Sequence, residues 1–328
     1  MKTDPIELIK NQILQSHRIA ITSHLRPDGD SICTCLALFF MGKLLGKEMA
    51  IINNDETPFP FNHFPDIEHI KIGQIPAEYY DTIILLECAN VQRSGQESLT
   101  KDFKINMDHH FSNDFYADIN WVDPEAPAVG SMAFLLGEKL EIAFSPQIAN
   151  HLYCAIVSDT GSFQFSNTNA LSFEVCYKLV EHGASPITIS EQLFNNNPPE
   201  KIKLLGQVLS TLRINDKGNI ATITMFKKNL DDLNLKQIDT EDITTQARSI
   251  KGVEMVLFFK EVKDNTFRIS VRSKGKSNAA LVAEHFGGGG HKHAAGFTAH
   301  GHYEKLLIDI PKIVNDLLKK NLEEKKQF

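Results

Sequence analysis

The sequence predicts an α/β protein with a doubly wound, mainly parallel sheet, followed by a second, smaller α+β domain. Continuous apolar runs at 19–23 and 82–86 are typical of strands that are covered on both faces. Segments with helical spacing of apolar residues alternate with such runs up to residue 185, and this alternation favours a parallel sheet. Beyond an asparagine- and proline-rich segment at 195–199, strand-like runs predominate, which indicates a separate domain.

The first domain is assigned to residues 1–190. In chain order, the strands expected in it are 19–23, 48–53, 70–72, 82–86 and 104–107, and the helices are 5–17, 31 to about 45, 131–140 and 146–157. Several of these strands end directly before a histidine or a carboxylate. Open α/β sheets bind their ligands at the carboxyl ends of the strands, so these strand ends are the first place to look for a site.

Residues 191–212 are assigned to a linker and a connecting helix, and residues 213–328 to the second domain. Pro198 and Pro199 cannot continue a helix or a central strand, which is why the boundary is placed there. The elements expected beyond them are a helix at 200–212, strands at 219–225, 253–261 and 266–271, and an amphipathic helix at 278–286. The charged segment 319–328 is expected to fray.

The composition predicts a soluble, cytoplasmic protein. The first ten residues form no secretory signal, no apolar run is long enough to cross a bilayer, and the five cysteines lie in apolar segments, as expected of reduced thiols. The net charge of −7 argues against a general polyanion-binding surface. Between Arg248 and Lys276, however, eight Lys or Arg stand against three Asp or Glu. This local surplus of positive charge suits a small anionic ligand.

His24, Asp28 and Asp30 stand within seven residues at the turn from a strand to a helix. Pro27 and Gly29 tighten this turn, so that both carboxylates can point to one side. Two carboxylates held so close repel each other unless a cation lies between them. The alternative is a plain helix N-cap at Asp30 or at the serine after it. Capping would use one residue of the group and leave the histidine without a role.

Further residues of the same kind follow other predicted elements. Glu87 follows the strand 82–86, Asp108 and His109 follow the strand 104–107, and Asp159 follows the helix 146–157. The carboxyl ends of parallel strands share one edge of a sheet, so these residues are expected to converge. The candidate metal ligands are His24, Asp28, Asp30, Glu87, His109 and Asp159.

A second group of candidate residues lies in the smaller domain. Arg272 ends a predicted strand and could grip a phosphate through two parallel hydrogen bonds. A run of glycines follows the helix 278–286, and its N–H groups could converge on an anion, with the N-terminus of a following helix adding its dipole. A flexible linker has the same composition, but the flanking basic residues favour phosphate binding. The predicted substrate-binding residues are Arg272, Ser273, Lys274, Gly288, Gly289, Gly290 and His291.

These motifs, in this order, resemble those of the DHH phosphoesterases that carry a C-terminal DHHA1 domain. Among them the chain is similar to the compact NrnA-type enzymes, which degrade very short RNAs and dephosphorylate 3′-phosphoadenosine 5′-phosphate. The motifs that carry the resemblance are His-x-x-x-Asp-x-Asp at 24–30, Asp-His-His at 108–110, Asp-Thr-Gly at 159–161, and Gly-Gly-Gly-His with Ala-Ala-Gly at 288–296. The resemblance covers essentially the whole chain.

The resemblance implies two divalent metal ions, usually Mn²⁺, with Mg²⁺ as the alternative. The implied ligands are His24, Asp28 and Glu87 for one ion, and Asp30, Glu87, His109 and Asp159 for the other. The family usually has aspartate at the shared position, where Glu87 is longer by one methylene. His110 and Arg272 would stabilise charge on the phosphate, and His110 would protonate the leaving oxygen. Asp108 is expected to orient a neighbouring histidine.

The expected function is manganese-dependent hydrolysis of short RNA to mononucleotides and of 3′-phosphoadenosine 5′-phosphate to AMP. The alternatives are a phosphodiesterase for cyclic dinucleotides or their linear products, a RecJ-like single-strand exonuclease, and a nucleotide-binding regulator with decayed catalysis. Glu87 is the only feature that favours the regulator. The expected partners are short RNAs and nucleotides, without a membrane. The strand end attacked and the oligomeric state, including a homodimer, are left open.

Overall fold

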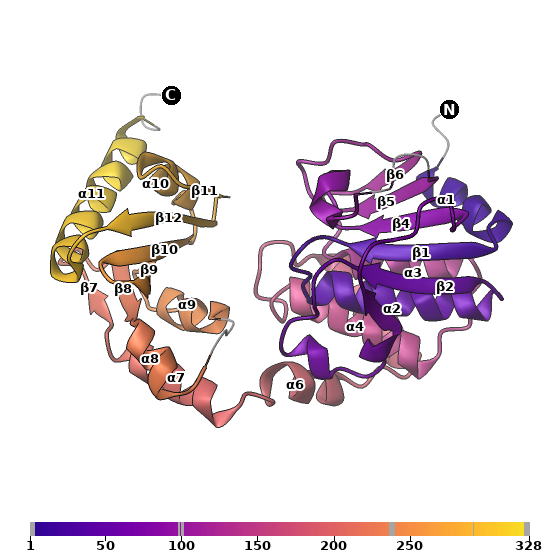
Figure 1. Cartoon of the computed structure of the whole chain (residues 1–328), viewed down its shortest axis with the longest axis horizontal. Coiled ribbons are helices and arrows are strands. Elements are labelled where there is room, and N and C mark those ends of the chain that lie inside the picture. Colours follow the sequence, from indigo (N-terminus) through magenta and orange to yellow (C-terminus); the bar gives the residue numbers. More distant parts are fainter. Residues whose placement is uncertain (1–3, 98, 100–101, 236–239, 291, 325–328) are drawn as a thin grey trace. The chain divides into compact units, whose positions relative to one another are not determined.

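The computed structural model describes residues 4–97, 99, 102–235, 240–290 and 292–324. The chain divides into two compact units, Met1–Asn196 and Asn197–Phe328, and this division falls inside the predicted linker region. Each unit is built around its own six-stranded sheet (Figure 1). An α/β unit with a parallel sheet followed by a smaller α+β unit confirms the predicted fold class.

The sheet of the first unit is parallel throughout, with the strand order β3-β2-β1-β4-β5-β6. Its strands are β1 (Arg18–Ser23), β2 (Glu48–Asn53), β3 (Ile70–Ile72), β4 (Thr82–Leu86), β5 (Lys104–Asp108) and β6 (Ile119–Val122). The chain runs outward from β1 to β3 and then returns to β4 on the other side of β1. Ligands of such sheets bind where the strand order reverses, which here is between β1 and β4.

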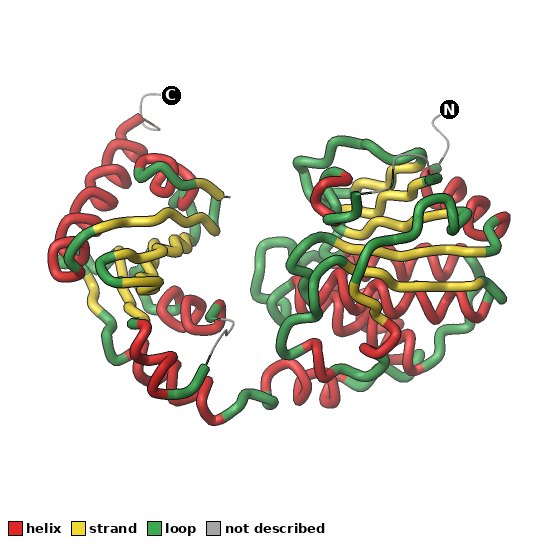
Figure 2. Tube along the Cα trace, in the orientation of Figure 1, coloured by secondary structure: helices red, strands yellow, loops and turns green. Residues whose placement is uncertain are grey.

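Helices and loops cover the two faces of this sheet. The helices are α1 (Pro5–Gln15), α2 (Gly29–Leu44), η1 (Phe61–His63), η2 (Ile67–His69), η3 (Val91–Ser94), α3 (Val129–Lys139), α4 (Pro146–Asp159), α5 (Ala170–Glu181) and α6 (Pro186–Phe194). In Figure 1, α2, α3 and α4 lie together along one face, where they share a core with strand residues such as Ile84. The neighbouring Ile83 and Leu85 point the other way and pack against Ile75 and Leu99 of the connecting segments, which are mostly loops (Figure 2).

The second unit has a mixed sheet with the order β11-β12-β10-β9-β8-β7, in which only the pairing of β8 with β9 is parallel among the described strands. Its strands are β7 (Arg213–Ile214), β8 (Ile220–Met225), β9 (Met255–Lys263), β10 (Thr266–Ser273), β11 (Gly289–Gly290) and β12 (Ala294–His300). Its helices are α7 (Pro199–Leu209), α8 (Lys227–Asp232), α9 (Glu241–Arg248), α10 (Ala279–His285) and α11 (Tyr303–Glu324). One apolar cluster lies between the sheet and α10 and α11, and another involves α7 and α9.

The second unit differs from the prediction at its C-terminal end. After the glycine run, Ala294–His300 form β12, which pairs with β10 over seven residues from Thr266 to Arg272. The expected fray from residue 319 begins too early, because α11 continues to Glu324; residues 325–328 lie outside the described part of the chain. The buried Val314 and Leu318 attach this helix to the core, and packing of an apolar stripe outweighs the charged composition of the segment.

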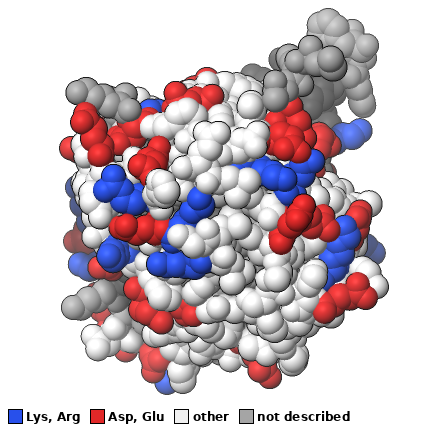
Figure 3. Space-filling view, turned by 90° about the vertical axis from the view of Figure 1, so that its right-hand side faces the viewer, with Lys and Arg blue, Asp and Glu red and all other residues white. Residues whose placement is uncertain are grey.

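Within the described part of the chain, no helix is both long enough and apolar enough to cross a membrane. Acidic and basic side chains are interspersed on the face drawn in Figure 3, without a broad patch of one sign. This face therefore has no feature of a general polyanion-binding surface.

Candidate active site

Three parallel strands deliver the candidate ligands to one edge of the first sheet. His24 directly follows β1, Glu87 directly follows β4, and Asp108 is the last residue of β5 with His109 after it. The strands are neighbours in the order β1-β4-β5, so their carboxyl ends lie side by side. The edge that carries them is the one at which the strand order reverses.

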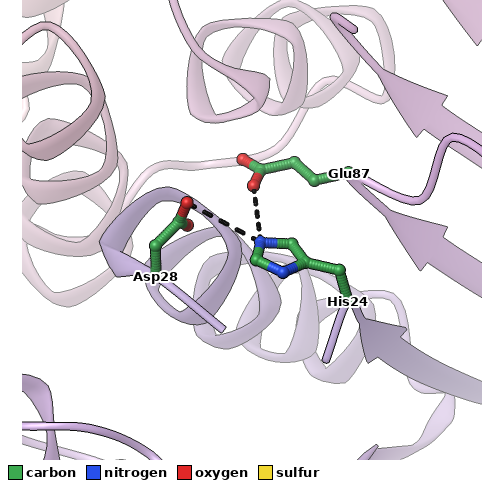
Figure 4. Close-up of side chains that lie close together, drawn as sticks. All are labelled: His24, Asp28 and Glu87. Atoms are coloured by element: carbon green, nitrogen blue, oxygen red, sulfur yellow. Dashed lines mark ion pairs between the residues drawn. The ribbon is translucent and has the colours of Figure 1, made fainter. Parts of the chain in front are cut away.

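His24, Asp28 and Glu87 form the first cluster (Figure 4). The His24 Nε2 atom lies 3.6 Å from Asp28 Oδ2 and 3.3 Å from Glu87 Oε2. Its other ring nitrogen, Nδ1, lies 2.8 Å from the Leu25 carbonyl oxygen, to which it donates as N–H. This hydrogen bond leaves the Nε2 lone pair facing the carboxylates, which is the orientation of a metal-ligating histidine.

Asp28 also caps α2, so the ligand and capping interpretations both apply to this turn. Its Oδ1 atom accepts a hydrogen bond from the Ser31 N–H at 3.1 Å, while the Ser31 hydroxyl lies 3.1 Å from the Asp28 N–H. The alternative prediction of a cap at Asp30 or Ser31 is wrong, because the first turn of the helix begins earlier, at Gly29.

Asp30 instead caps a different helix, α3, which begins about 100 residues later. Its carboxylate accepts hydrogen bonds from the Val129 N–H at 2.6 Å and the Gly130 N–H at 2.8 Å. The N-cap residue of α3 is Ala128, which has no side-chain acceptor. A Cβ at position 130 would lie 2.5 Å from the Ala155 Cβ, so glycine permits the close approach of α3 to α4 beside Asp30.

The second cluster consists of Asp30, Glu87 and His109, each with a ligand atom within 4.8 Å of the others. The His109 Nδ1 atom lies 3.1 Å from the Ala126 carbonyl oxygen, which again leaves Nε2 for a ligand. Asp159, the last residue of α4, places Oδ2 3.8 Å from His109 Nε2. Glu87 belongs to both clusters, as the sequence resemblance implies for a shared ligand.

Asn167, which no sequence motif predicts to be functional, holds Asp159 in this position. Its Nδ2 atom lies 2.9 Å from Asp159 Oδ2, 3.2 Å from the Asp159 carbonyl oxygen and 2.8 Å from the Pro127 carbonyl oxygen. It thereby ties the end of α4 to the segment just before α3. No local pattern distinguishes this asparagine from its neighbour Asn169, so the sequence offered no signal for it.

The electrostatics of the site favour a cation. Burial raises the pKa of Glu87 well above its usual range, and the negative charges of Asp28 and Asp30 raise it further. Burial, followed by the charge of Asp30, raises the pKa of Asp159 to about 7. The Glu87 Oε1 atom is buried and has no hydrogen-bond partner among the described residues. The site thus combines buried carboxyl groups, one of which has an oxygen without a hydrogen-bond partner among the described residues, with two histidines whose Nε2 atoms face them. This combination fits a divalent cation.

Asp108 contacts His110, as predicted for a residue that orients a neighbouring histidine. Asp108 Oδ1 lies 2.6 Å from His110 Nδ1, and Oδ2 accepts a hydrogen bond of 2.6 Å from Asn113 Nδ2. Burial raises the pKa of Asp108, but the hydrogen bonds from His110 and Asn113 and the charge of His110 together outweigh it, and the pKa falls below the usual range. Asp108 is fully buried, whereas the His110 side chain is 38% exposed. Because Nδ1 faces Asp108, Nε2 is the ring nitrogen that can act on a ligand.

In the second unit, two of the predicted substrate-binding side chains are used inside the fold. Ser273 is 1% exposed, and its hydroxyl lies 2.9 Å from the Ser277 carbonyl oxygen and 3.0 Å from the Lys292 carbonyl oxygen. The Lys274 ammonium donates to the carbonyl oxygens of Arg248 and Ile250 at 2.8 and 2.9 Å, where α9 ends. Each of these side chains thus satisfies buried or terminal carbonyl groups of its own unit, and the role of both in substrate binding stays a prediction.

The glycine run also has a structural role. The Gly287 N–H donates to the Glu284 carbonyl oxygen, and the Gly288 N–H donates to the Ala283 carbonyl oxygen. This is the Schellman arrangement, and it ends α10. Gly289 and Gly290 form β11, and a Cβ on Gly290 would lie 2.5 Å from the backbone of β12. The predicted helix after the run is wrong, because the described residues there lead into β12. His291 lies outside the described residues.

Basic side chains nevertheless gather at this end of β10. Arg272 is partly exposed, and Lys276 is exposed. His293, which the sequence analysis did not single out, places Nδ1 3.1 Å from the Ser273 hydroxyl. Burial lowers the pKa of His293, and the positive charges of Lys292 and Arg248 lower it further. The end of β10 is therefore electropositive.

Comparisons with known proteins agree with this architecture. The family model described as "DHH family, N-terminal domain" matches residues 18–156, and the "DHHA1 domain" model matches residues 217–320. The chain belongs to the DHH family. Its second unit is the DHHA1 domain. As a member of this family, the protein is a phosphoric ester hydrolase.

Curated relatives extend over nearly the whole chain. The bifunctional oligoribonuclease and PAP phosphatase NrnA of Thermus thermophilus is 29% identical over 296 residues, which cover 88% of each chain. The probable bifunctional oligoribonuclease and PAP phosphatase NrnA of Streptococcus mutans is 27% identical and covers 92% of this chain and 95% of its own. A crystal structure of an exopolyphosphatase-related protein from Bacteroides fragilis has the same fold, with a TM-score of 0.88, 24% identity and 97% of both chains covered.

Proposed function

We propose that the protein hydrolyses short RNA oligonucleotides to mononucleotides, and 3′-phosphoadenosine 5′-phosphate to AMP, with two divalent metal ions. The observation that carries the proposal is the pair of ligand clusters that share Glu87 at the reversal point of the DHH sheet. The names of the relatives from T. thermophilus and S. mutans supply the substrate class.

The proposed ligands of the two ions are His24, Asp28 and Glu87 for one, and Asp30, Glu87, His109 and Asp159 for the other. A mixed set of imidazole and carboxylate ligands suits Mn²⁺ better than an all-oxygen set, which would favour Mg²⁺. When bound, such ions neutralise phosphoryl oxygens and lower the pKa of water. Glu87 and Asp159, with their raised pKa values, would give up protons on metal binding.

The roles of the remaining residues follow from their contacts. His110 donates Nδ1–H to the buried Asp108, so Nε2 is the ring nitrogen that would carry a proton to the leaving oxygen. Asp108 holds this tautomer and is itself held by Asn113. In the DHHA1 unit, we assign Arg272 to the phosphate of the substrate, with Ser273 and Lys274 shaping the strand end that presents it.

The test compares initial rates of Mn²⁺-dependent hydrolysis of the linear dinucleotide pApA and of a long single-stranded DNA, with chelator as the blank. We expect pApA to be preferred at least tenfold, and 3′-phosphoadenosine 5′-phosphate to be converted to AMP. Equal or reversed rates would instead identify a general single-strand exonuclease. Binding of metal and nucleotide without turnover would identify a regulator and overturn the proposal.

A further inference from the structure

The loop that follows β5 presents two aromatic side chains to solvent next to His110. Phe111, the residue directly after His110, is 93% exposed, and Phe115 is 64% exposed. Phenylalanine is ordinarily buried, since water contact with its ring is unfavourable. Two such rings within five residues of a candidate proton donor therefore need an explanation other than core packing.

The loop is held in place by buried polar contacts rather than by its phenylalanines. The Asn113 side chain accepts from Asn106 Nδ2 at 3.1 Å and donates to Asp108 Oδ2 at 2.6 Å and to the Cys88 carbonyl oxygen at 3.2 Å. The Asp114 N–H donates to the Ala89 carbonyl oxygen at 2.8 Å. The loop is thus fastened to the segment that follows Glu87, along the same edge of the sheet as the candidate ligands.

The third aromatic residue of this loop shows that an inward position is available. Tyr116 packs against the apolar cluster under the sheet, and its hydroxyl donates to Asn106 Oδ1 at 3.4 Å. Phe111 and Phe115 do not share this burial, and neither belongs to a described apolar cluster. Their exposure is therefore a property of their place in the loop and not of the whole loop.

We propose that Phe111 is a stacking platform for a nucleobase of the substrate, with Phe115 as a secondary contact. This inference rests on the proposed function, since it needs a substrate with a base beside the scissile phosphate. An exposed aromatic ring on a fixed loop stacks on any base, because every base has a π-face. The platform would position the phosphate beside His110 and would favour nucleotides over phosphate esters that lack a base.

The first readout is binding, which does not depend on turnover. A dinucleotide that contains 2-aminopurine is titrated into the full-length protein, and its fluorescence is expected to be quenched on stacking. Phe111→Ala should abolish most of the quenching, Phe115→Ala should reduce it less, and Phe111→Tyr should retain it. The control is Phe173→Ala, which removes another exposed phenylalanine, 56% exposed, from α5.

The second readout is kinetic. For Phe111→Ala we expect KM for pApA to rise about tenfold, a loss within the usual range for removing one stacking partner. The rate on a ribose bisphosphate without a base should be the same in both proteins. Unchanged quenching and unchanged KM in Phe111→Ala would overturn the inference. If the wild type bound the fluorescent dinucleotide with quenching but hydrolysed neither pApA nor 3′-phosphoadenosine 5′-phosphate, the proposed function would fail while the platform stood.

Discussion

The ligand clusters at the DHH sheet edge and the basic strand end of the DHHA1 unit both follow from motifs in the sequence, but their side chains differ in what they contact. At the first site, Glu87 has an oxygen without a partner among the described residues, and the histidine Nε2 atoms face carboxylates. At the second site, Ser273 and Lys274 bond to carbonyl oxygens of their own unit. The first site keeps a buried carboxyl oxygen unsatisfied for a ligand, whereas most of the second motif stabilises the fold that carries it.

The contacts of a motif residue distinguish a ligand-binding role from a structural one. A buried charge without a partner is unfavourable for folding, so it is retained where a ligand will compensate it. A polar side chain whose hydrogen bonds are complete inside the fold contributes to stability. Substitutions at the first site should therefore reduce activity more than stability, and those at Ser273 should do the reverse.

The largest effect is expected for Glu87→Gln. Loss of the shared ligand should reduce hydrolysis more than about a hundredfold, since even outer partners of metal ligands are typically worth 10- to 100-fold. The melting temperature in chelator should stay equal or rise, because the raised pKa of Glu87 beside Asp28 and Asp30 is unfavourable for folding at neutral pH and the variant lacks this titrating group. Glu56→Gln, at an exposed position, is the matched control. A variant that loses activity only because it unfolds would contradict the contrast drawn between the two sites.

Asp159 should give the metal-free protein a distinctive pH dependence. Its pKa is raised from 3.8 to about 7, so the folded state holds this proton more tightly than the unfolded state. The contribution to stability is thus present at low pH and is lost as the pH rises through about 7. We measure the melting temperature in chelator at pH 5 and pH 8. The change between the two pH values should differ between wild type and Asp159→Asn by roughly several degrees. Asp264→Asn, on the surface, serves as the reference, and parallel profiles for all three proteins would argue against this role of Asp159.

Asn167→Ala tests the support of a ligand separately from the ligand itself, because it removes no predicted ligand. We expect a loss of activity of about 10- to 100-fold and a higher Mn²⁺ requirement, as is usual for partners that orient a ligand. The control is Asn169→Ala, which removes the N-cap of α5 two residues away. That variant should lose about 1 kcal/mol of stability and retain its metal requirement. If the two variants had the same metal titration, Asn167 would be a structural residue only.

The smallest effects on activity are expected for substitutions in the DHHA1 unit. Ser273→Ala should cost about 1–3 kcal/mol in the free energy of unfolding, since it leaves buried carbonyl groups without their donor, and should leave KM for short RNA near the wild-type value. Arg272→Ala should raise KM and lower stability less than Ser273→Ala does. Urea denaturation and steady-state kinetics on the same preparations check both. The reverse outcome, a KM effect at Ser273 alone, would restore it as a contact of the substrate.

The apolar patterns and motifs of the sequence are enough to predict the fold class, most strands and a shared edge of the sheet for the candidate ligands. Period-2 and period-3.6 apolar patterns are local properties, and a residue placed at the end of a parallel strand has only one edge of the sheet to occupy. That is why His24, Glu87 and His109 could be brought together from their positions alone. The family resemblance, confirmed by the DHH and DHHA1 matches, rests on the same short motifs.

Packing in three dimensions determines which polar groups form hydrogen bonds and with which partners. Asp30 caps a helix that begins 99 residues later, Asn167 ties α4 to the start of α3, and Ser273 bonds across the DHHA1 unit. The glycine run ends a helix and lies against a strand instead of opening a second helix. Hydrogen bonds of this kind join residues that are remote in the chain, and no local pattern encodes their partners. The assignment of ligand, cap and support among similar residues therefore depends on packing.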